Sequence, residues 1–181
     1  TQEVVVTDDE NPSITCPADI AVSADAGSCF ATVALGSPVT NDNCGLASVS
    51  NDAPATFPIG STTVTWTVTD DYGNTATCTQ EVVVTDDEDP TIACPADIAV
   101  SADAGSCFAT LALGSPVTND NCGVASVSND APAQFPIGST TVTWTVTDDY
   151  GNTATCTQEV VVTDDEDPTI ACPADIAVSA D

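Results

Sequence analysis

The feature that most constrains this chain is a repeat of 78 residues. The segment DDENP at residues 8–12 returns as DDEDP at residues 86–90 and again at residues 164–168. Residues 8–85 and 86–163 are identical at 72 of 78 positions. Self-similarity at a fixed period is typical of tandem arrays, in which each repeat forms one structural unit. We therefore expect at least two near-identical domains in place of one large core.

The repeat also sets the expected domain boundaries. Residues 8–85 and 86–163 are predicted to be complete domains. Residues 1–7 copy residues 79–85 and are predicted to be the last strand of a preceding repeat, and residues 164–181 are predicted to be the first strand of a following one. The chain is expected to be a window from a longer array.

Each repeat has the pattern of an all-β domain. Residues 63–69 (TVTWTVT) alternate between threonine and apolar residues, and this period of two is typical of a half-buried strand. Short strands separated by turn residues favour a β-sandwich. The strands of the first repeat are predicted at Ile14–Ala24, Phe30–Leu35, Ala47–Ser50, Thr63–Thr69 and Ala76–Thr85.

The charge composition excludes several classes of function. The chain has no lysine, arginine or histidine, and its 28 aspartates and glutamates give a formal net charge of −28. Without these side chains the usual general bases and activated nucleophiles cannot be assembled. A pair of carboxylates could still catalyse glycoside hydrolysis, but the acids lie in loops and no aromatic sugar groove is visible. We predict that the chain is not an enzyme.

The same charge limits the partners of the chain. Nucleic-acid phosphates require cationic side chains, so neither DNA nor RNA is an expected partner. No apolar run is long enough to span a bilayer, and no membrane insertion is expected. The natural partner of this acidic surface is a cation, and calcium fits best because hard oxygen ligands are in excess. Nine cysteines at ordered spacings indicate an oxidising, extracellular location.

Five motifs, in order, resemble the hyalin repeat (HYR) family, and the resemblance covers the whole chain. They are CPADI (16–20), GSCFAT (27–32), NDNCG (41–45), FPIGSTTVTW (57–66) and DYGNTATC (71–78). The resemblance implies a sandwich similar to immunoglobulin and fibronectin type III domains. It also implies a role in extracellular adhesion proteins or large bacterial surface proteins.

Sequence alone leaves the disulfide connectivity open, but an immunoglobulin-like strand order favours one pattern. In that order Cys44 and Cys78 lie at one pole, so we expect Cys44–Cys78 and its copy Cys122–Cys156. A further hypothesis joins neighbouring repeats. Its two bonds are Cys29–Cys94 and Cys107–Cys172, and the alternative pairs Cys16 with Cys29 inside the domain.

Three acidic segments of each repeat are predicted to converge at a calcium site between domains. They are the linker that enters the repeat, the loop before the third strand and the last turn. Carboxylate and asparagine oxygens suit calcium, although such residues are also common in turns for backbone reasons. The predicted ligands are Asp8, Asp9, Glu10, Asp42, Asp70, Asp71, Asp86, Asp87, Glu88, Asp89, Asn119, Asp120, Asp148 and Asp149.

The near-identity of the repeats favours a structural function. A contact that repeats from unit to unit without closing produces a fibre. We therefore expect an extracellular filament or rigid stalk that self-associates along or between its repeats, stabilised by disulfides and calcium. The alternative is a cell-surface adhesin or binding module whose repeats present a ligand-binding tip.

Overall fold

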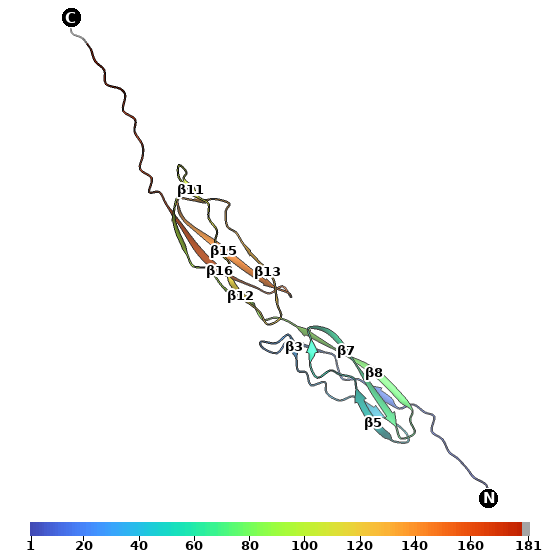
Figure 1. Cartoon of the computed structure of the whole chain (residues 1–181). Coiled ribbons are helices and arrows are strands. Elements are labelled where there is room, and N and C mark those ends of the chain that lie inside the picture. The colour runs from blue at the N-terminus through green and yellow to red at the C-terminus, as the bar shows by residue number, and fades with distance from the viewer. Residues whose placement is uncertain (179–181) are drawn as a thin grey trace. The chain divides into compact units, whose positions relative to one another are not determined.

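The structure, a computed structural model, describes residues 1–178, and this part of the chain contains strands and no helix (Figure 1). Accordingly, no helix in residues 1–178 could cross a membrane. The chain divides into two compact units. The first comprises residues 1–91, 119–126 and 147–153, and the second comprises residues 92–118, 127–146 and 154–181.

The two repeats contain the same eight strands in the same order. In the first repeat they are β1 (Ser13–Thr15), β2 (Ile20–Ser23), β3 (Phe30–Ala31), β4 (Val39–Asn41), β5 (Leu46–Asn51), β6 (Phe57–Pro58), β7 (Gly60–Asp70) and β8 (Thr75–Thr85). In the second they are β9 (Thr91–Ala93), β10 (Ile98–Ser101), β11 (Phe108–Ala109), β12 (Val117–Asn119), β13 (Val124–Asn129), β14 (Phe135–Pro136), β15 (Gly138–Asp148) and β16 (Thr153–Thr163).

Each repeat is a β-sandwich, which confirms the predicted fold class. In the first repeat the main sheet has the order β2-β8-β7-β5, and the smaller pairs are β1-β4 and β3-β6. The long strands β7 and β8 pair antiparallel, whereas β2 pairs parallel with β8 in the register Ile20↔Val82 to Ser23↔Thr85. The second repeat has the same order, β10-β16-β15-β13, with β12-β9 and β11-β14.

The core of the first repeat follows the alternation predicted for β7. Val64 and Val68 are fully buried, Trp66 is 6% exposed, and the threonines between them are half-buried. The opposing strand contributes the buried Gln80, whose side chain accepts a hydrogen bond from Trp66 Nε1 at 3.2 Å. Gln80 also donates to the carbonyl of Ala18 at 2.6 Å, so its buried amide is well satisfied.

The disulfide inside each repeat differs from the prediction. Cys16 bonds to Cys78, and Cys94 bonds to Cys156, so the expected Cys44–Cys78 pairing and its copy at Cys122 are wrong. The reason is the direction of the side chains along β8. Residue 78 has the same parity as the buried residues of that strand, and both bonded cysteines pack against the core, whereas Cys44 is exposed.

The bond between repeats also differs from the prediction. Cys29 bonds to Cys122, and both cysteines lie in the first compact unit. The expected bond Cys29–Cys94 is wrong, because Cys94 packs against the core of its own repeat, where it meets Cys156. The expected bond Cys107–Cys172 is also wrong, because neither cysteine is bonded in the part of the chain that the structure describes. The alternative bond Cys16–Cys29 is also wrong, because Cys16 bonds to Cys78. Within the described residues Cys44, Cys107 and Cys172 are unpaired and exposed.

The two ends of the chain contain no strand in the part that the structure describes. Residues 1–12 and 164–178 have no assigned strand, although a loop at Asp8–Asp9 contacts the first repeat. That residues 1–7 and 164–181 are strands of neighbouring repeats therefore stays a prediction, and residues 179–181 lie outside the described residues.

Candidate metal centre

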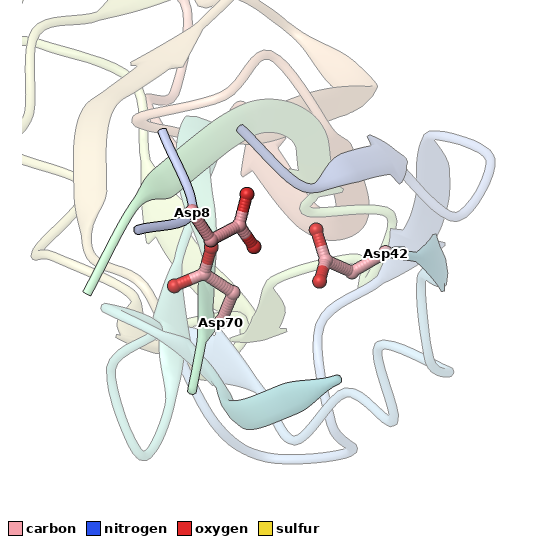
Figure 2. A group of neighbouring side chains, drawn as sticks. All are labelled: Asp8, Asp42 and Asp70. Carbon is pink, nitrogen blue, oxygen red and sulfur yellow. The ribbon is translucent and has the colours of Figure 1, made fainter. Parts of the chain in front are cut away.

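Three carboxylates from distant segments meet at one end of the first repeat. Asp8 belongs to the segment that enters the repeat, Asp42 follows β4, and Asp70 ends β7. One oxygen from each lies within 4.8 Å of the others, and Figure 2 shows the three side chains arranged around a common space. Each of the three acidic segments identified in the sequence therefore supplies one member.

Asp70 is the anchor of this cluster. It is only 1% exposed, because it occupies the inward parity of β7 that Val64, Trp66 and Val68 also occupy. The turn into β8 wraps around it. Its Oδ1 accepts from the backbone N–H of Tyr72 at 2.9 Å and of Asn74 at 2.8 Å.

Asn74 joins two members of the cluster. Its side-chain amide donates to Asp70 Oδ2 at 2.7 Å and to the backbone carbonyl of Asp8 at 3.2 Å. The entering segment is thus fixed against the turn by one residue. Asp42 is oriented separately, since its Oδ2 accepts from the backbone N–H of Cys44 at 2.8 Å.

Two carboxylate oxygens of the cluster have no hydrogen-bond partner although they are buried. They are Oδ2 of Asp8 and Oδ1 of Asp42. A buried acceptor without a partner is costly, roughly 1–3 kcal/mol and more for a charged group. A cation in the space between the carboxylates would satisfy both oxygens and offset the repulsion of the three negative charges. The three ligand groups of the cluster are all carboxylates, and such hard oxygen ligands suit calcium or magnesium more than a soft metal.

The ionisation of the cluster is set by opposing effects. Burial raises the pKa of the Asp70 carboxyl, but hydrogen bonds from the Asn74 side chain and from neighbouring backbone N–H groups outweigh burial and hold the pKa below its ordinary value. Asp70 is therefore a carboxylate at neutral pH, as a metal ligand must be. Asp8 raises the pKa of the nearby Cys44 thiol through a hydrogen bond, and desolvation raises it further.

The second repeat contains the same cluster. Asp86, Asp120 and Asp148 lie within the same 4.8 Å limit, and Asp148 is 2% exposed. Asn152 donates to Asp148 Oδ2 at 2.8 Å and to the carbonyl of Asp86 at 3.3 Å. Asp86 Oδ2 and Asp120 Oδ1 are again buried without a partner, and hydrogen bonds again hold the pKa of Asp148 below its ordinary value against burial.

Eight other predicted ligands are not members of the two clusters. Three of them accept different hydrogen bonds: Glu10 from Asn43 Nδ2 at 3.3 Å, Asp87 from Ser23 Oγ at 2.7 Å and Glu88 from the N–H of Gly27 at 2.8 Å. A role for any of the eight as a ligand stays a prediction. They are Asp9, Glu10, Asp71, Asp87, Glu88, Asp89, Asn119 and Asp149.

The sequence grouped Asn152, the counterpart of Asn74, with the acidic turn, but it did not identify Asn74 as the residue that connects the entering segment to the turn. Asn74 lies two residues after Tyr72 in the turn. Its spacing of four residues from Asp70 is the signal that could have suggested a contact between the two side chains. Asn121, which belongs to the loop that the sequence predicted to supply ligands, also has a buried Oδ1 without a partner.

A family profile and several known proteins match most of the chain. A family profile described as HYR domain matches residues 7–84 and 85–162. The chain is 34% identical over 171 residues to "Sushi, von Willebrand factor type A, EGF and pentraxin domain-containing protein 1" of Rattus norvegicus, covering 89% of this chain and 5% of that protein. It is 33% identical over 173 residues to Hyalin of Lytechinus variegatus, covering 90% of this chain and 33% of that protein. The chain thus spans a third or less of these relatives.

Matches among solved structures include fragments of two cadherins. Human protocadherin-24 EC1-2 matches with a TM-score of 0.41 and 12% identity, over 86% of this chain and 99% of that one. Mouse cadherin-23 EC22-24 matches with a TM-score of 0.38 and 16% identity, over 90% and 67% of the two chains. Both TM-scores lie below 0.5.

Proposed function

The chain belongs to the HYR domain family, and from this premise we propose that it is a structural, load-carrying part of an extracellular filament or stalk. The three disulfides found within residues 1–178 fit an extracellular location. The observation that carries the proposal is the position of the disulfide inside each repeat. It connects the segment that enters the repeat directly to the strand that leaves it.

The covalent path of a pulling force is therefore short. Force applied at the N-terminal side of the first repeat reaches Cys16, crosses to Cys78 and leaves along β8. The 62-residue separation between the two cysteines is bypassed. The bond between Cys94 and Cys156 does the same in the second repeat, with the same separation of 62. Most of each sandwich is thus removed from the direct line of tension.

The hydrogen bonds of the main sheet support the same function. β2 lies near the start of the repeat and pairs parallel with β8 at its end. β2 lies inside the segment that the Cys16–Cys78 bond bypasses, so a pulling force loads the ladder between β2 and β8 only after that bond is reduced; the two strands then slide along each other, and their hydrogen bonds are loaded together. Opening the same bonds one at a time, as in an unzipped hairpin, would require less force.

Calcium is the proposed stabiliser of the entry to each repeat. A cation held by Asp8, Asp42 and Asp70 would join the entering segment to the loop before β5 and to the β7–β8 turn. Extracellular modules bind calcium with Kd values on the order of 10⁻⁴ to 10⁻³ M. At one hundred times its Kd, a site present only in the folded state stabilises that state by about 2.7 kcal/mol. The buried oxygens without partners support this assignment.

The experiment that tests the load path is single-molecule stretching between Thr1 and Asp181. With disulfides intact, two segments with a separation of 62 residues each stay outside the taut chain. Reduction should therefore lengthen the fully stretched chain by roughly 420 Å, at about 3.5 Å per residue.

Cys29→Ala is the matched control for this experiment. It removes the Cys29–Cys122 bond, but both of these residues lie within the bypassed segments. The stretched length of the oxidised variant should equal that of the parent chain. A chain that does not lengthen on reduction, or that lengthens in Cys29→Ala alone, would overturn the proposed load path.

A further inference from the structure

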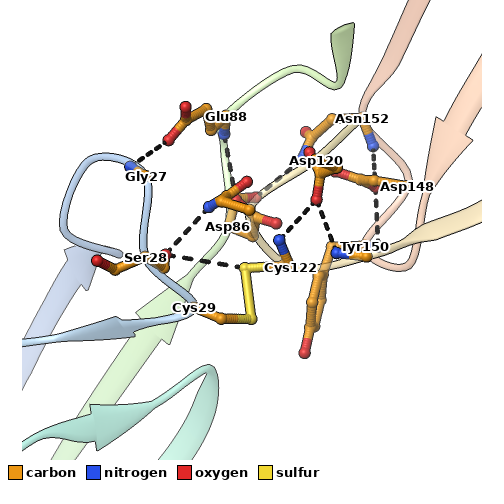
Figure 3. Close-up of a disulfide and its surroundings, with 12 residues drawn as sticks. Gly27, Ser28, Cys29, Asp86, Glu88, Asp120, Cys122, Asp148, Tyr150 and Asn152 are labelled. Atoms are coloured by element: carbon orange, nitrogen blue, oxygen red, sulfur yellow. Dashed lines mark hydrogen bonds between the residues drawn. A yellow bond between two sulfur atoms is a disulfide. The ribbon is translucent and has the colours of Figure 1, made fainter. Parts of the chain in front are cut away.

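The Cys29–Cys122 disulfide lies next to the cation site of the second repeat (Figure 3). This site consists of Asp86, Asp120 and Asp148. Every residue of the bond and of the site belongs to the first compact unit. Hydrogen bonds connect each half of the disulfide to one of the segments that carry these carboxylates, so the bond and the site share their supporting contacts.

The first connection is the loop that carries Cys122. Asp120 Oδ2 accepts from the backbone N–H of Cys122 at 2.7 Å and from that of Gly123 at 2.9 Å. The other oxygen of the same carboxylate, Oδ1, is buried without a partner. The carboxylate that would bind the cation is therefore oriented by the N–H of the bonded cysteine.

The second connection is the loop that carries Cys29. The N–H of Gly27, two residues before Cys29, donates to Glu88 Oε2 at 2.8 Å. Glu88 in turn donates its backbone N–H to Asp86 Oδ1 at 3.3 Å. Asp86 Oδ2 is the second buried oxygen of this site without a partner. The position of Asp86 is thus tied to the loop that carries the other cysteine.

A third contact joins the two loops directly. Asn121 Nδ2 donates to the backbone carbonyl of Ser28 at 3.0 Å, so the residues beside the two cysteines are hydrogen-bonded to each other. The intact disulfide keeps this donor and acceptor together. After the disulfide is broken, contacts of this kind must hold the loops alone, and a single hydrogen bond contributes little net stability in water.

We propose that the Cys29–Cys122 disulfide is a positioning element for the cation site of the second repeat, and that bond and site are coupled. The intact bond raises the affinity for calcium, because it holds Asp86 and Asp120 at the same distance in the empty and the loaded site. Bound calcium makes the bond harder to reduce, because it holds the two loops where the cysteines meet. This inference rests on the proposed function and adds a redox control to its calcium site.

The coupling is reciprocal, so its two sides can be measured separately. If the intact bond raises the calcium affinity by some factor, saturating calcium must shift the thiol–disulfide equilibrium toward the disulfide by the same factor. Coupling between sites in proteins commonly corresponds to factors of about 5–150. We expect about tenfold, near the low end of that range, because Asp148 is held independently by hydrogen bonds from Asn152.

The reductant is a low-molecular-weight thiol such as glutathione. Its thiolate attacks one sulfur of the protein disulfide and forms a mixed disulfide, and the other cysteine leaves as a thiolate and takes up a proton. A second small thiolate attacks the small-molecule sulfur of the mixed disulfide and releases the remaining cysteine. The protein disulfide gains two electrons and two protons in total, and two small thiols become one small disulfide.

The first test is calcium titration of the full chain. In every protein compared, the three cysteines that are unpaired within residues 1–178 are replaced by serine, so that no free thiol exchanges with the bond: Cys44, Cys107 and Cys172. Asp70→Asn removes the site of the first repeat. In this background Cys29→Ala with Cys122→Ala should raise the calcium Kd about tenfold. Alanine keeps the backbone N–H that Asp120 accepts, so the pair of substitutions removes the bond alone.

The matched control keeps the site of the first repeat and removes that of the second. Asp148→Asn takes the place of Asp70→Asn, and the same pair of alanines is introduced at Cys29 and Cys122. None of the hydrogen bonds that connect the disulfide to the second site reaches the first, so the calcium Kd of this control should not change.

The second test measures the reduction equilibrium of the bond in glutathione buffers, with and without saturating calcium. Free thiols are alkylated, and cleavage before aspartate releases Cys29 in residues 25–41 and Cys122 in residues 120–129. Calcium should shift the equilibrium toward the disulfide by about tenfold. In the Asp148→Asn protein calcium should have no effect on it.

Equal calcium affinity with and without the bond, or a reduction equilibrium that calcium does not shift, would overturn the coupling and leave the calcium site itself intact. If neither the Asp70→Asn nor the Asp148→Asn protein binds calcium, the calcium part of the proposed function fails together with this inference. The stretching experiment needs no calcium, so the load path is judged independently of both.

Discussion

Removal of the Cys16–Cys78 disulfide is predicted to be the most damaging double substitution in the first repeat. The bond closes a loop with a sequence separation of 62. The chain-entropy relation for a loop of that size gives a stabilisation of about 4 kcal/mol. Small domains are stable by only about 5–15 kcal/mol. Cys16→Ala with Cys78→Ala should therefore bring the first repeat close to unfolding at ordinary temperature.

The assay is urea unfolding followed by tryptophan fluorescence. Trp144→Phe is introduced into every protein compared, so that Trp66 alone reports on the first repeat. Cys44→Ser is the matched control, because Cys44 is exposed and unpaired, and its substitution should change the free energy of unfolding by less than about 0.5 kcal/mol. A loss below about 1 kcal/mol in the double variant would refute the assignment of this bond as the main constraint on the repeat.

Further substitutions test the first repeat in the same assay. Gln80→Leu leaves the N–H of Trp66 and two backbone carbonyls without partners and should destabilise by at least about 3 kcal/mol, at 1–3 kcal/mol for each group; a loss below 1 kcal/mol would contradict this. Gly45→Ala and Gly60→Ala should each destabilise by about 1 kcal/mol or more, because both glycines have a φ above +100°, a conformation that strains a residue with a Cβ. A Cβ at Gly45 would meet Asp71 Oδ2 at 2.5 Å, but this oxygen ends an exposed side chain that can rotate away, so the two losses should be similar; a loss below about 0.5 kcal/mol in either variant would contradict the backbone strain.

The long strands could be predicted from sequence because their pattern and their packing agree. The threonine–apolar alternation of residues 63–69 predicts β7, and the structure buries its apolar residues. The single strand predicted at Ile14–Ala24 is instead two strands, β1 and β2, with Pro17 between them. Proline lacks the N–H that a continuous ladder would need. The sequence pattern does not predict β4, whose three residues directly after Pro38 are too few to show a period.

Disulfide connectivity and ligand identity depend on which face of a strand a side chain occupies. In β8 the buried Gln80 shows that residue 78 faces inward, and this excludes a bond to the exposed Cys44. The same alternation of inward and outward side chains distinguishes Asp70 from its neighbour: Asp70 is buried at the end of β7, whereas Asp71 is exposed. Sequence identified the acidic segments, but the choice of one carboxylate from each depends on packing between segments that are distant in the chain.

The role of the three-aspartate clusters is tested most directly by isothermal titration of the full, oxidised chain with calcium. Two ions should bind per chain, and Asp70→Asn should leave one. Asp70→Asn combined with Asp148→Asn should leave none. Asp52→Asn is the control: Asp52 accepts from the N–H of Thr65 at 2.7 Å outside either cluster, so this variant should still bind two. Equal binding by the parent chain and the Asp70→Asn/Asp148→Asn variant, or no binding by either at millimolar calcium, would contradict the assignment of these clusters as calcium sites.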